Sequence, residues 1–214
     1  MNEFRSLPRS FYEPSAKEVA LALLGHWLIR NTPAGPMGGP IVETEAYLKD
    51  DPACHAAPGL TARNRTMFGP PGHGYVYLIY GYHFCVNAVC QPVGVGEAVL
   101  IRAVEPAFGR EQMLVRRPVQ ESRNLTNGPA KLCSAMGIDT TLDGVDLCNS
   151  GTDLVIARNP SVETFNRECG PVVTTTRIGI SRAADLPLRF YLSGSLFVSR
   201  RVKPRLHQGE MSIH

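Results

Sequence analysis

Two glutamates stand two residues apart in the run IVETEAYL at residues 41–48. If this run forms a strand, its period of two places Glu43, Glu45 and Tyr47 on one face and apolar side chains on the other. One interpretation is an edge strand with a solvated acidic face. The other is that one carboxylate lies in a cleft as a general base, with Tyr47 as a wall of that cleft.

An arginine in an apolar pattern is the second candidate for chemistry. Residues 97–105 alternate like a strand, and Arg102 shares its face with Leu100 and Val104. A buried guanidinium among apolar side chains needs a carboxylate, phosphate or carbonyl partner. We therefore expect Arg102 either to pair with a glutamate or a substrate phosphate, or to lie at the sheet margin with its head in water.

Tyrosines form the third candidate, because four of the seven in the chain fall within residues 75–82. Alternation places Tyr75 and Tyr77 on one face, and Tyr80 on the other, beside a turn at Gly81. A tyrosine at a hairpin tip suits a wedge that parts a base step, whereas inward aromatic side chains can stack on an extruded base. The alternative is an aromatic strand packed in the core, which suits Tyr75 better than Tyr80.

Charge, cysteine spacing and the length of apolar runs limit which classes of protein the sequence fits. The chain carries 22 basic and 19 acidic residues, and a net charge of +3 is too small to identify a nucleic-acid binder. The six cysteines form no Cys-x-x-Cys pair, so we expect free thiols and no metal site. No apolar run is long enough to span a membrane and the chain begins without a signal-peptide pattern, which predicts a cytoplasmic protein.

The expected helices and strands follow one another in irregular order, which predicts a mixed α+β fold, and the length of 214 residues predicts a single domain. Ser15 and Glu18 have capping-box spacing, which predicts a helix over residues 15–24. Further helices are expected over 105–117 and 128–136, each opened by a Pro or Gly-Pro signal. Strands are expected over 27–30, 40–48, 75–91 with a turn near residue 81, 97–105, 154–157, 172–180 and 188–198. Residues 50–74 read as a long loop with a helical turn, and loops of this length are usually functional or disordered.

Several blocks recur in the order of a known family: IVETEAY at 41–47, His55, RNRTMF at 63–68, YVYLIYG at 75–81, CVN at 85–87, LIRAVEP at 100–106, GPAKL at 128–132 and RIG at 177–179. Over nearly its whole length the chain resembles the alkyladenine (3-methyladenine) DNA glycosylase family. The resemblance implies a single domain over residues 1–214, with termini at about 1–10 and 205–214 as candidates for flexibility. It also implies a mixed, mainly antiparallel curved sheet flanked by helices, and a protruding β-hairpin that enters the DNA minor groove.

The implied activity is that of a monofunctional base-excision repair enzyme. The resemblance implies that such an enzyme acts as a monomer, without a cofactor, on double-stranded DNA. Such an enzyme flips 3-methyladenine, 7-methylguanine, hypoxanthine or ethenoadenine out of the duplex and hydrolyses the N-glycosidic bond, leaving an abasic site. In a bacterium, the protein is expected to associate with the nucleoid.

The resemblance also implies roles for individual residues. Glu45 matches the catalytic glutamate that deprotonates the attacking water, and Arg102 and the main chain of Ile178 match positions that hold this water. The residues that match the walls of the base pocket are Tyr47, His55, Tyr77 and Asn87. Among these, Asn87 matches the asparagine whose bulk disfavours the amino group of guanine.

Contacts with the duplex are implied for a second group of residues. Tyr80 matches the tyrosine that fills the gap left by the flipped base. Tyr82 stands where many relatives carry methionine, which predicts a bulkier wedge, and the loop from 48 to 63 aligns with gaps. Arg63, Arg65 and Lys131 match regions near the phosphate backbone.

Two other functions stay open at this point. A module without catalytic activity could bind RNA by stacking bases on its tyrosines, and a nucleoside hydrolase could use the same carboxylate. Neither needs a residue that replaces an extruded base, so the exposed position expected for Tyr80 favours duplex DNA.

Overall fold

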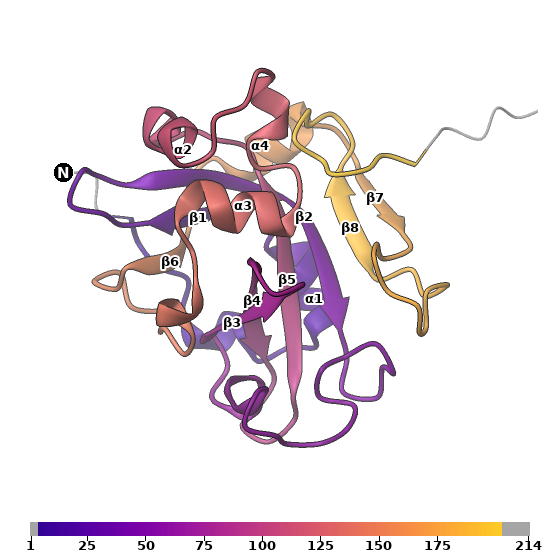
Figure 1. The fold of residues 1–214 in the computed structure, drawn as a ribbon. Coiled ribbons are helices and arrows are strands. Elements are labelled where there is room, and N and C mark those ends of the chain that lie inside the picture. Colours follow the sequence, from indigo (N-terminus) through magenta and orange to yellow (C-terminus); the bar gives the residue numbers. More distant parts are fainter. Residues whose placement is uncertain (1–3, 203–214) are drawn as a thin grey trace, which may run out of the picture.

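The computed structural model describes residues 4–202 (Figure 1). Its α-helices are α1 (Ala16–Ala22), α2 (Arg110–Arg116), α3 (Pro129–Met136) and α4 (Val162–Glu168). Short 3₁₀ turns occupy η1 (Arg9–Tyr12), η2 (Arg65–Phe68), η3 (Ser122–Asn124) and η4 (Thr140–Leu142). The strands are β1 (Trp27–Arg30), β2 (Met37–Tyr47), β3 (Gly74–Ile79), β4 (His83–Cys90), β5 (Glu97–Val104), β6 (Leu154–Ala157), β7 (Val172–Thr175) and β8 (Arg189–Leu192).

The described strands form one curled sheet in the order β3-β4-β5-β2-β1-β6, and every pairing between them is antiparallel. Strand β8 pairs with β2, and β7 pairs with β8 (Figure 1). The expected α+β domain with a mainly antiparallel, curved sheet is confirmed. Within residues 4–202, no helix has the length and apolarity needed to cross a bilayer.

The two ends of the chain, about 1–10 and 205–214, are expected to be flexible. Residues 1–3 of the first range and all of the second range lie outside the described residues. Of the rest, Leu7 is fully buried, and its N–H donates to the carbonyl of Ile156 at 2.9 Å. Ser6 forms a bridge with Ala157, the last residue of β6.

Local signals account for the helices that the sequence predicts well. The Ser15 side chain accepts from the N–H of Glu18, and the Glu18 carboxylate accepts from the N–H of Ser15 at 3.1 Å, so the expected capping box is present at α1. Helix α3 begins with Pro129 at its first turn and ends at Gly137, whose φ of 62° is left-handed.

Strand β2 lies inside the sheet, so the interpretation of residues 41–48 as an edge strand with a solvated acidic face is wrong. Its first part pairs with β1, and Glu43 and Glu45 lie between β5 on one side and β8 on the other. A β-bulge shifts the pairing with β5 on either side of Glu43. Both glutamates are fully buried.

The helix expected over 105–117 is shorter than predicted, because residues 105–108 continue the pairing with β2. The N–H of Glu105 donates to Pro40 at 2.9 Å, and the N–H of Phe108 donates to Gly38 at 3.0 Å. Helix α2 begins only after Gly109, whose φ of 59° breaks the extended run. The strands expected over 172–180 and 188–198 are also shorter, and α4 is not predicted from the sequence.

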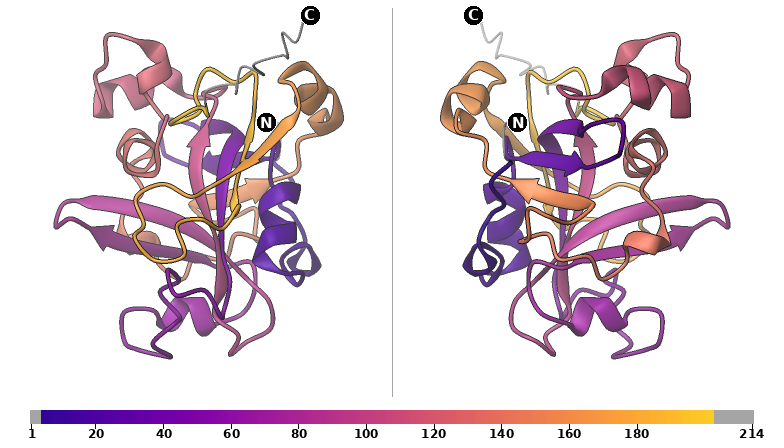
Figure 2. Two further views of the ribbon diagram at one scale, coloured as in Figure 1. Left: turned by 90° about the vertical axis from the view of Figure 1, so that its right-hand side faces the viewer. Right: turned by 90° about the vertical axis from the view of Figure 1, so that its left-hand side faces the viewer.

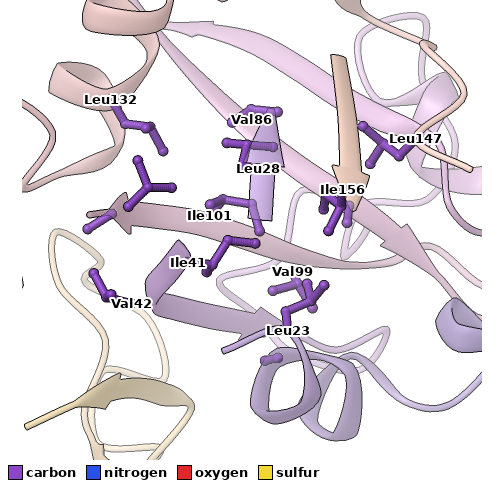
Figure 3. Packing of buried hydrophobic residues seen from close by; sticks show 14 of the residues in the cluster. Leu23, Leu28, Ile41, Val42, Val86, Val99, Ile101, Leu132, Leu147 and Ile156 are labelled. Carbon is purple, nitrogen blue, oxygen red and sulfur yellow. The ribbon is translucent and has the colours of Figure 1, made fainter. Parts of the chain in front are cut away.

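The main apolar core lies on the face of the sheet opposite to the glutamates. Val86 of β4, Val99 and Ile101 of β5, and Leu23 beside α1 pack together there (Figure 3). Thr44, on the core face of β2, donates to the carbonyl of Ala20 at 2.9 Å and so joins α1 to the sheet. This packing leaves the other face of the sheet available for polar side chains.

A hairpin formed by β3 and β4 extends past the neighbouring elements in both side views (Figure 2). Its strands pair from Gly74 and Ala88 at the base to Ile79 and His83 near the tip. The turn between them contains Tyr80 and Gly81, with φ values of 53° and 78°. The predicted turn near residue 81 is therefore present.

Candidate active site

One face of the sheet carries the predicted site residues that lie on strands, namely Glu45, Tyr47, Tyr77, Asn87 and Arg102. Directly opposed residues of antiparallel strands project to the same face. Leu100 of β5 is the partner of Asn87 on one side and of Glu45 on the other, and Arg189 of β8 is the next partner of Glu45. The pairing of Tyr77 with Cys85 extends this face to the hairpin.

A pocket of about 300 Å³ opens over this face, between the hairpin, the long loop and the segment after β7. Its volume is at the lower end of the range for small-molecule sites. The lining residues are Tyr47, Ala53, His55, Met67, Tyr75, Tyr77, Ile79, Tyr80, Cys85, Asn87, Leu100, Arg102, Pro129, Ile178, Gly179 and Ile180.

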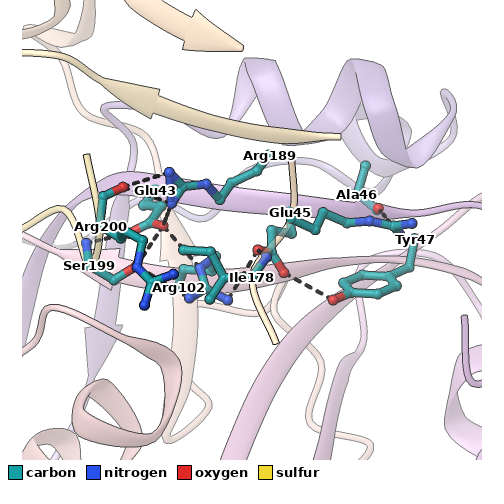
Figure 4. A network of polar contacts seen from close by, with 10 residues as sticks. Glu43, Glu45, Ala46, Tyr47, Arg102, Ile178, Arg189, Ser199 and Arg200 are labelled. Atoms are coloured by element: carbon teal, nitrogen blue, oxygen red, sulfur yellow. Dashed lines mark hydrogen bonds and ion pairs between the residues drawn. The ribbon is translucent and has the colours of Figure 1, made fainter. Parts of the chain in front are cut away.

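Glu45 lies at the edge of this pocket and is held by three residues that line it (Figure 4). Its Oε1 accepts from the N–H of Ile178 at 2.8 Å and lies 3.2 Å from Nη1 of Arg102. Its Oε2 accepts from the hydroxyl of Tyr47 at 2.9 Å. Burial raises the pKa of Glu45 above its ordinary value, while these three contacts oppose that rise and nearby Glu43 adds to it.

Arg102 is buried and paired, so the interpretation that its head lies in water at the sheet margin is wrong. Its Nε donates to Oε1 of Glu43 at 3.0 Å, and its Nη1 contacts Glu45, as the expected pairing with a glutamate requires. Burial opposes its positive charge, but Glu45 and Glu43 outweigh this effect and raise the pKa of Arg102. One guanidinium therefore bridges two buried carboxylates.

Tyr47 forms a wall of the pocket, as one sequence interpretation predicts. The guanidinium of Arg177 lies 4.7 Å from the centre of its ring. Burial, followed by the charge of Glu45, raises the pKa of Tyr47 far above its usual value, so the hydroxyl stays protonated and can only donate to Glu45.

The aromatic side of the pocket is formed by His55, Tyr75 and Tyr77. The ring centres of His55 and Tyr77 are 4.5 Å apart, and Nδ1 of His55 lies 3.0 Å from the hydroxyl of Tyr75. Burial, with a contribution from Arg63, lowers the pKa of His55, which favours the neutral ring. Asn87 is buried, and its Nδ2 donates to the carbonyl of Tyr75 at 3.0 Å, so its position is also held.

Two tyrosines stand at the hairpin tip, and each is 73% exposed. Tyr80 lines the pocket mouth and has a left-handed φ, which is unusual for a residue with a bulky side chain. Tyr82 lies with its ring centre 4.2 Å from that of His83. The interpretation of this stretch as a strand wholly packed in the core is wrong for these two residues, whereas Tyr75 is buried.

The three basic residues that are expected near the phosphate backbone of DNA do not form one cluster. Arg63 is exposed beside the pocket, where its Nη2 donates to Leu78 at 3.1 Å and its guanidinium lies 6.0 Å from the Tyr77 ring. Arg65 is exposed on η2. Lys131 donates to Oδ1 of Asn127 at 2.8 Å and lines a separate hollow, while Pro129 at the start of the same helix lines the pocket.

Two buried ion pairs beside the pocket are not predicted from the sequence. Arg177 donates to both carboxylate oxygens of Asp51, and Arg189 donates to Glu43 at 2.9 Å. Each arginine stands in or beside an apolar run, so the reasoning applied to Arg102 could have found them. The strand pattern alone treats Glu43 and Glu45 alike and does not show that Glu43 pairs with Arg102 and Arg189.

The cysteines, and the side chains that could hold a metal ion, also bear on what the site can do chemically. All six cysteines are free thiols, as predicted, and Cys85 lines the pocket. Burial raises the pKa of the Cys85 thiol and keeps it in the unreactive protonated form. Among residues 4–202, no group of three or more histidine, cysteine, aspartate or glutamate side chains is arranged to hold a metal ion.

Comparison with known proteins points to one family. The model of the methylpurine-DNA glycosylase family matches residues 10–196. A relative from Methanoculleus marisnigri is 48% identical over 197 residues, which cover 92% of this chain and 100% of the relative. Relatives from Agrobacterium fabrum and Carboxydothermus hydrogenoformans are each 46% identical, over 92% and 91% of this chain and 94% and 99% of their own lengths. The names of all three propose a 3-methyladenine DNA glycosylase.

Proposed function

This chain belongs to the methylpurine-DNA glycosylase family, and on that premise we propose that it removes damaged purines from duplex DNA by hydrolysing the N-glycosidic bond with a water molecule activated by Glu45. It is a DNA glycosylase, a hydrolase of N-glycosyl bonds that acts in base-excision repair. The proposal extends this general activity to a reaction mechanism, a lesion class and the roles of named residues.

The observation that carries the proposal is the environment of Glu45. It accepts hydrogen bonds from Tyr47 and Ile178 and forms an ion pair with Arg102, and all three partners are walls of one pocket. Oε2 accepts one of these hydrogen bonds only, so it retains a lone pair that can accept a proton from water. A carboxylate with a raised pKa is a better general base near neutral pH than an exposed one.

The aromatic walls support a preference for alkylated purines. Alkylation at a ring nitrogen gives the purine a positive charge and makes it a good leaving group. The faces of Tyr47 and Tyr77 attract such a cation, and each contact contributes on the order of 0.5–2 kcal/mol. Asn87, held by Tyr75, supports discrimination against guanine because its bulk would meet the exocyclic amino group.

The lesion determines whether an acid is also needed. Cationic 3-methyladenine and 7-methylguanine can leave without further protonation. Neutral hypoxanthine and ethenoadenine must be protonated as they leave, so their excision is expected to fall at high pH.

The hairpin supports extrusion of the base into this pocket. Tyr80 is exposed at the pocket mouth, where its ring can occupy the place of the flipped base and replace part of the lost stacking. Tyr82 supplies a second exposed ring at the same tip. Arg63 and Arg65 lie exposed on the adjoining loop, where they can contact phosphates, and Lys131 is a more distant candidate.

Glu45→Gln tests the mechanism. Duplexes with 7-methylguanine, hypoxanthine or ethenoadenine are incubated with the protein, and abasic sites are revealed by alkaline cleavage. The variant keeps the size of the side chain but lacks the base, so excision should fall by at least about 100-fold while binding to a duplex with an abasic analogue persists. Undiminished excision by Glu45→Gln would overturn the proposed mechanism.

A matched control and two competitors complete this experiment. Glu163 is an exposed carboxylate on α4, and Glu163→Gln should leave excision unchanged. Free nucleosides and single-stranded RNA test the two other functions. Cleavage of nucleosides in preference to duplex lesions would favour a nucleoside hydrolase, and RNA binding without any excision would favour a module without catalytic activity.

A further inference from the structure

Glu43 is the most extensively hydrogen-bonded carboxylate beside the pocket, although it does not line it. Its Oε1 accepts from Nε of Arg102 at 3.0 Å, Nη1 of Arg189 at 2.9 Å and Oγ of Ser199 at 2.8 Å. Its Oε2 accepts from the N–H of Ser199 at 2.7 Å. Figure 4 shows these donors converging on Glu43, beside the separate contacts of Glu45.

Arg102 transmits this arrangement to Glu45. Its Nε is held by Glu43 and its Nη2 donates to Oγ of Ser199 at 3.2 Å, which leaves Nη1 directed at Glu45. Because the guanidinium is planar and rigid, two contacts on one edge determine where the remaining nitrogen points. The orientation of Arg102 toward Glu45 therefore depends on Glu43.

Arg189 balances the charge of the cluster. Without it, Glu43 and Glu45 would share the single positive charge of Arg102. With it, two buried carboxylates face two guanidinium groups. Both terminal nitrogens of Arg189 also donate to the carbonyl of Arg200, at 2.9 and 2.6 Å, so the segment after β8 holds Arg189 in place.

We propose that Glu43 and Arg189 form a positioning pair that orients Arg102 and sets the charge around Glu45. The pair thereby determines the lowest pH at which Glu45 can still accept a proton from water. The inference rests on the proposed role of Glu45 as the base. It assigns neither Glu43 nor Arg189 a contact with DNA or with the reacting atoms.

The groups that face Glu45 determine the direction in which each substitution should move its pKa. These are Glu43 and Tyr47 on its own strand, Arg102 on β5, Arg189 on β8 and Cys85 on β4. The negative charge of Glu43 raises the pKa of Glu45, so its removal should lower that pKa. Removal of Arg189 leaves Glu43 less compensated and also removes a positive charge near Glu45, so the pKa of Glu45 should rise.

The experiment measures single-turnover excision of cationic 7-methylguanine against pH. Glu43→Gln should move the acidic limb of the profile to lower pH, and Arg189→Met should move it to higher pH, each by about 0.5–1 unit. Arg189→Lys keeps the charge and should leave the limb closer to that of the parent protein. The double variant Glu43→Gln/Arg189→Met removes both charges and should return the limb toward its parent position.

Titration of the Glu45 carboxyl carbon by ¹³C NMR gives the same shifts without reliance on turnover. If the larger substitutions prevent folding, Ser199→Ala decides the question: it removes one donor to Glu43 and keeps the main-chain N–H, so the limb should move slightly to higher pH. A uniform loss of rate with an unmoved limb would show a merely structural role and overturn the inference. If Glu45→Gln retained excision, the proposed function would fail instead.

Discussion

Glu45 experiences two opposed effects, and their balance defines what it can do. Burial raises its pKa, whereas Arg102, the Ile178 N–H and the Tyr47 hydroxyl stabilise its charged form. With burial alone, the carboxyl would tend to hold its own proton, and with the three donors alone it would be a weak base. The combination suits a group that must accept a proton from water near neutral pH.

Tyr47→Phe isolates the hydroxyl from the aromatic wall. The ring stays, but Oε2 of Glu45 loses its donor at 2.9 Å, so the pKa of Glu45 should rise. Excision of 7-methylguanine should then lose its rate at a higher pH than in the parent protein, by up to about one unit. The measurement is a single-turnover pH profile, and an unmoved acidic limb would show that this hydrogen bond does not tune Glu45.

The β3–β4 hairpin places a non-glycine residue in a left-handed conformation at its tip. Such conformations occur at functional sites, where the surrounding structure maintains them. Tyr80→Ala keeps a β-carbon, and therefore the backbone preference, while it removes the ring. Capture of the flipped base should weaken by about 10–100-fold, since stacking of one base on an aromatic ring contributes on the order of 1–3 kcal/mol.

Fluorescence of a base analogue placed opposite or beside the lesion can follow this capture. Tyr82→Ala provides the comparison, because Tyr82 is equally exposed but does not line the pocket. Its effect should be smaller than that of Tyr80→Ala. Parent-level binding and excision by Tyr80→Ala would exclude it as the wedge.

The segment after β7 is attached to the long loop by the buried pair of Asp51 and Arg177. Arg177 also donates to the carbonyl of Ala46 at 3.0 Å, and the next residue supplies the N–H that contacts Glu45. Asp51→Asn should therefore destabilise the fold by about 3–5 kcal/mol, because it leaves a buried charge without its partner. Excision should decline as well, since Ile178 loses its anchor.

Urea unfolding at neutral pH measures this loss of stability. Asp185 is an exposed aspartate in the segment between Arg177 and β8, and Asp185→Asn is the matched control. Its free energy of unfolding should stay within about 0.5 kcal/mol of the parent value. A similarly small change in Asp51→Asn would contradict the role given to the pair.

At the scale of the whole molecule, His26 joins distant parts of the chain. Its Nδ1 accepts from the N–H of Asn159 at 3.2 Å, and Nδ2 of Asn159 donates to the carbonyl of Gly25 at 2.9 Å. Burial, with a contribution from Arg158, lowers the pKa of His26 to about 4. The folded protein therefore keeps this ring neutral over a range in which the unfolded chain binds a proton.

Stability should consequently fall as the pH is lowered from about 6.5, the ordinary pKa of histidine, to about 4. His26→Asn lacks the titratable ring, so its free energy of unfolding should depend less on pH in this window. Urea unfolding at several pH values tests the difference between the two proteins. The raised pKa of Glu45 acts in the opposite sense, so only that difference isolates His26; parallel curves would contradict the prediction.

Local sequence patterns were sufficient for much of the fold. The capping box of α1, the Gly-Pro start of α3 and the turn at Gly81 depend on residues a few positions apart, and all three are confirmed. Patterns failed where a distant partner overrode them. Residues 105–108 pair with β2 rather than open a helix, and the segment after Thr175 leaves the sheet to reach Asp51 and Glu45.

Strand alternation is enough to predict that Glu43, Glu45 and Tyr47 share one face, and therefore which side chains are candidates for catalysis. That this face is buried, and that arginines balance the charge of its two glutamates, follows only from the folded chain. Arg102, Ile178 and Arg189 reach the two glutamates from 59, 133 and 146 residues away. The physical reason is that strand periodicity is a property of the local backbone, whereas burial and charge pairing depend on which distant strands close around it.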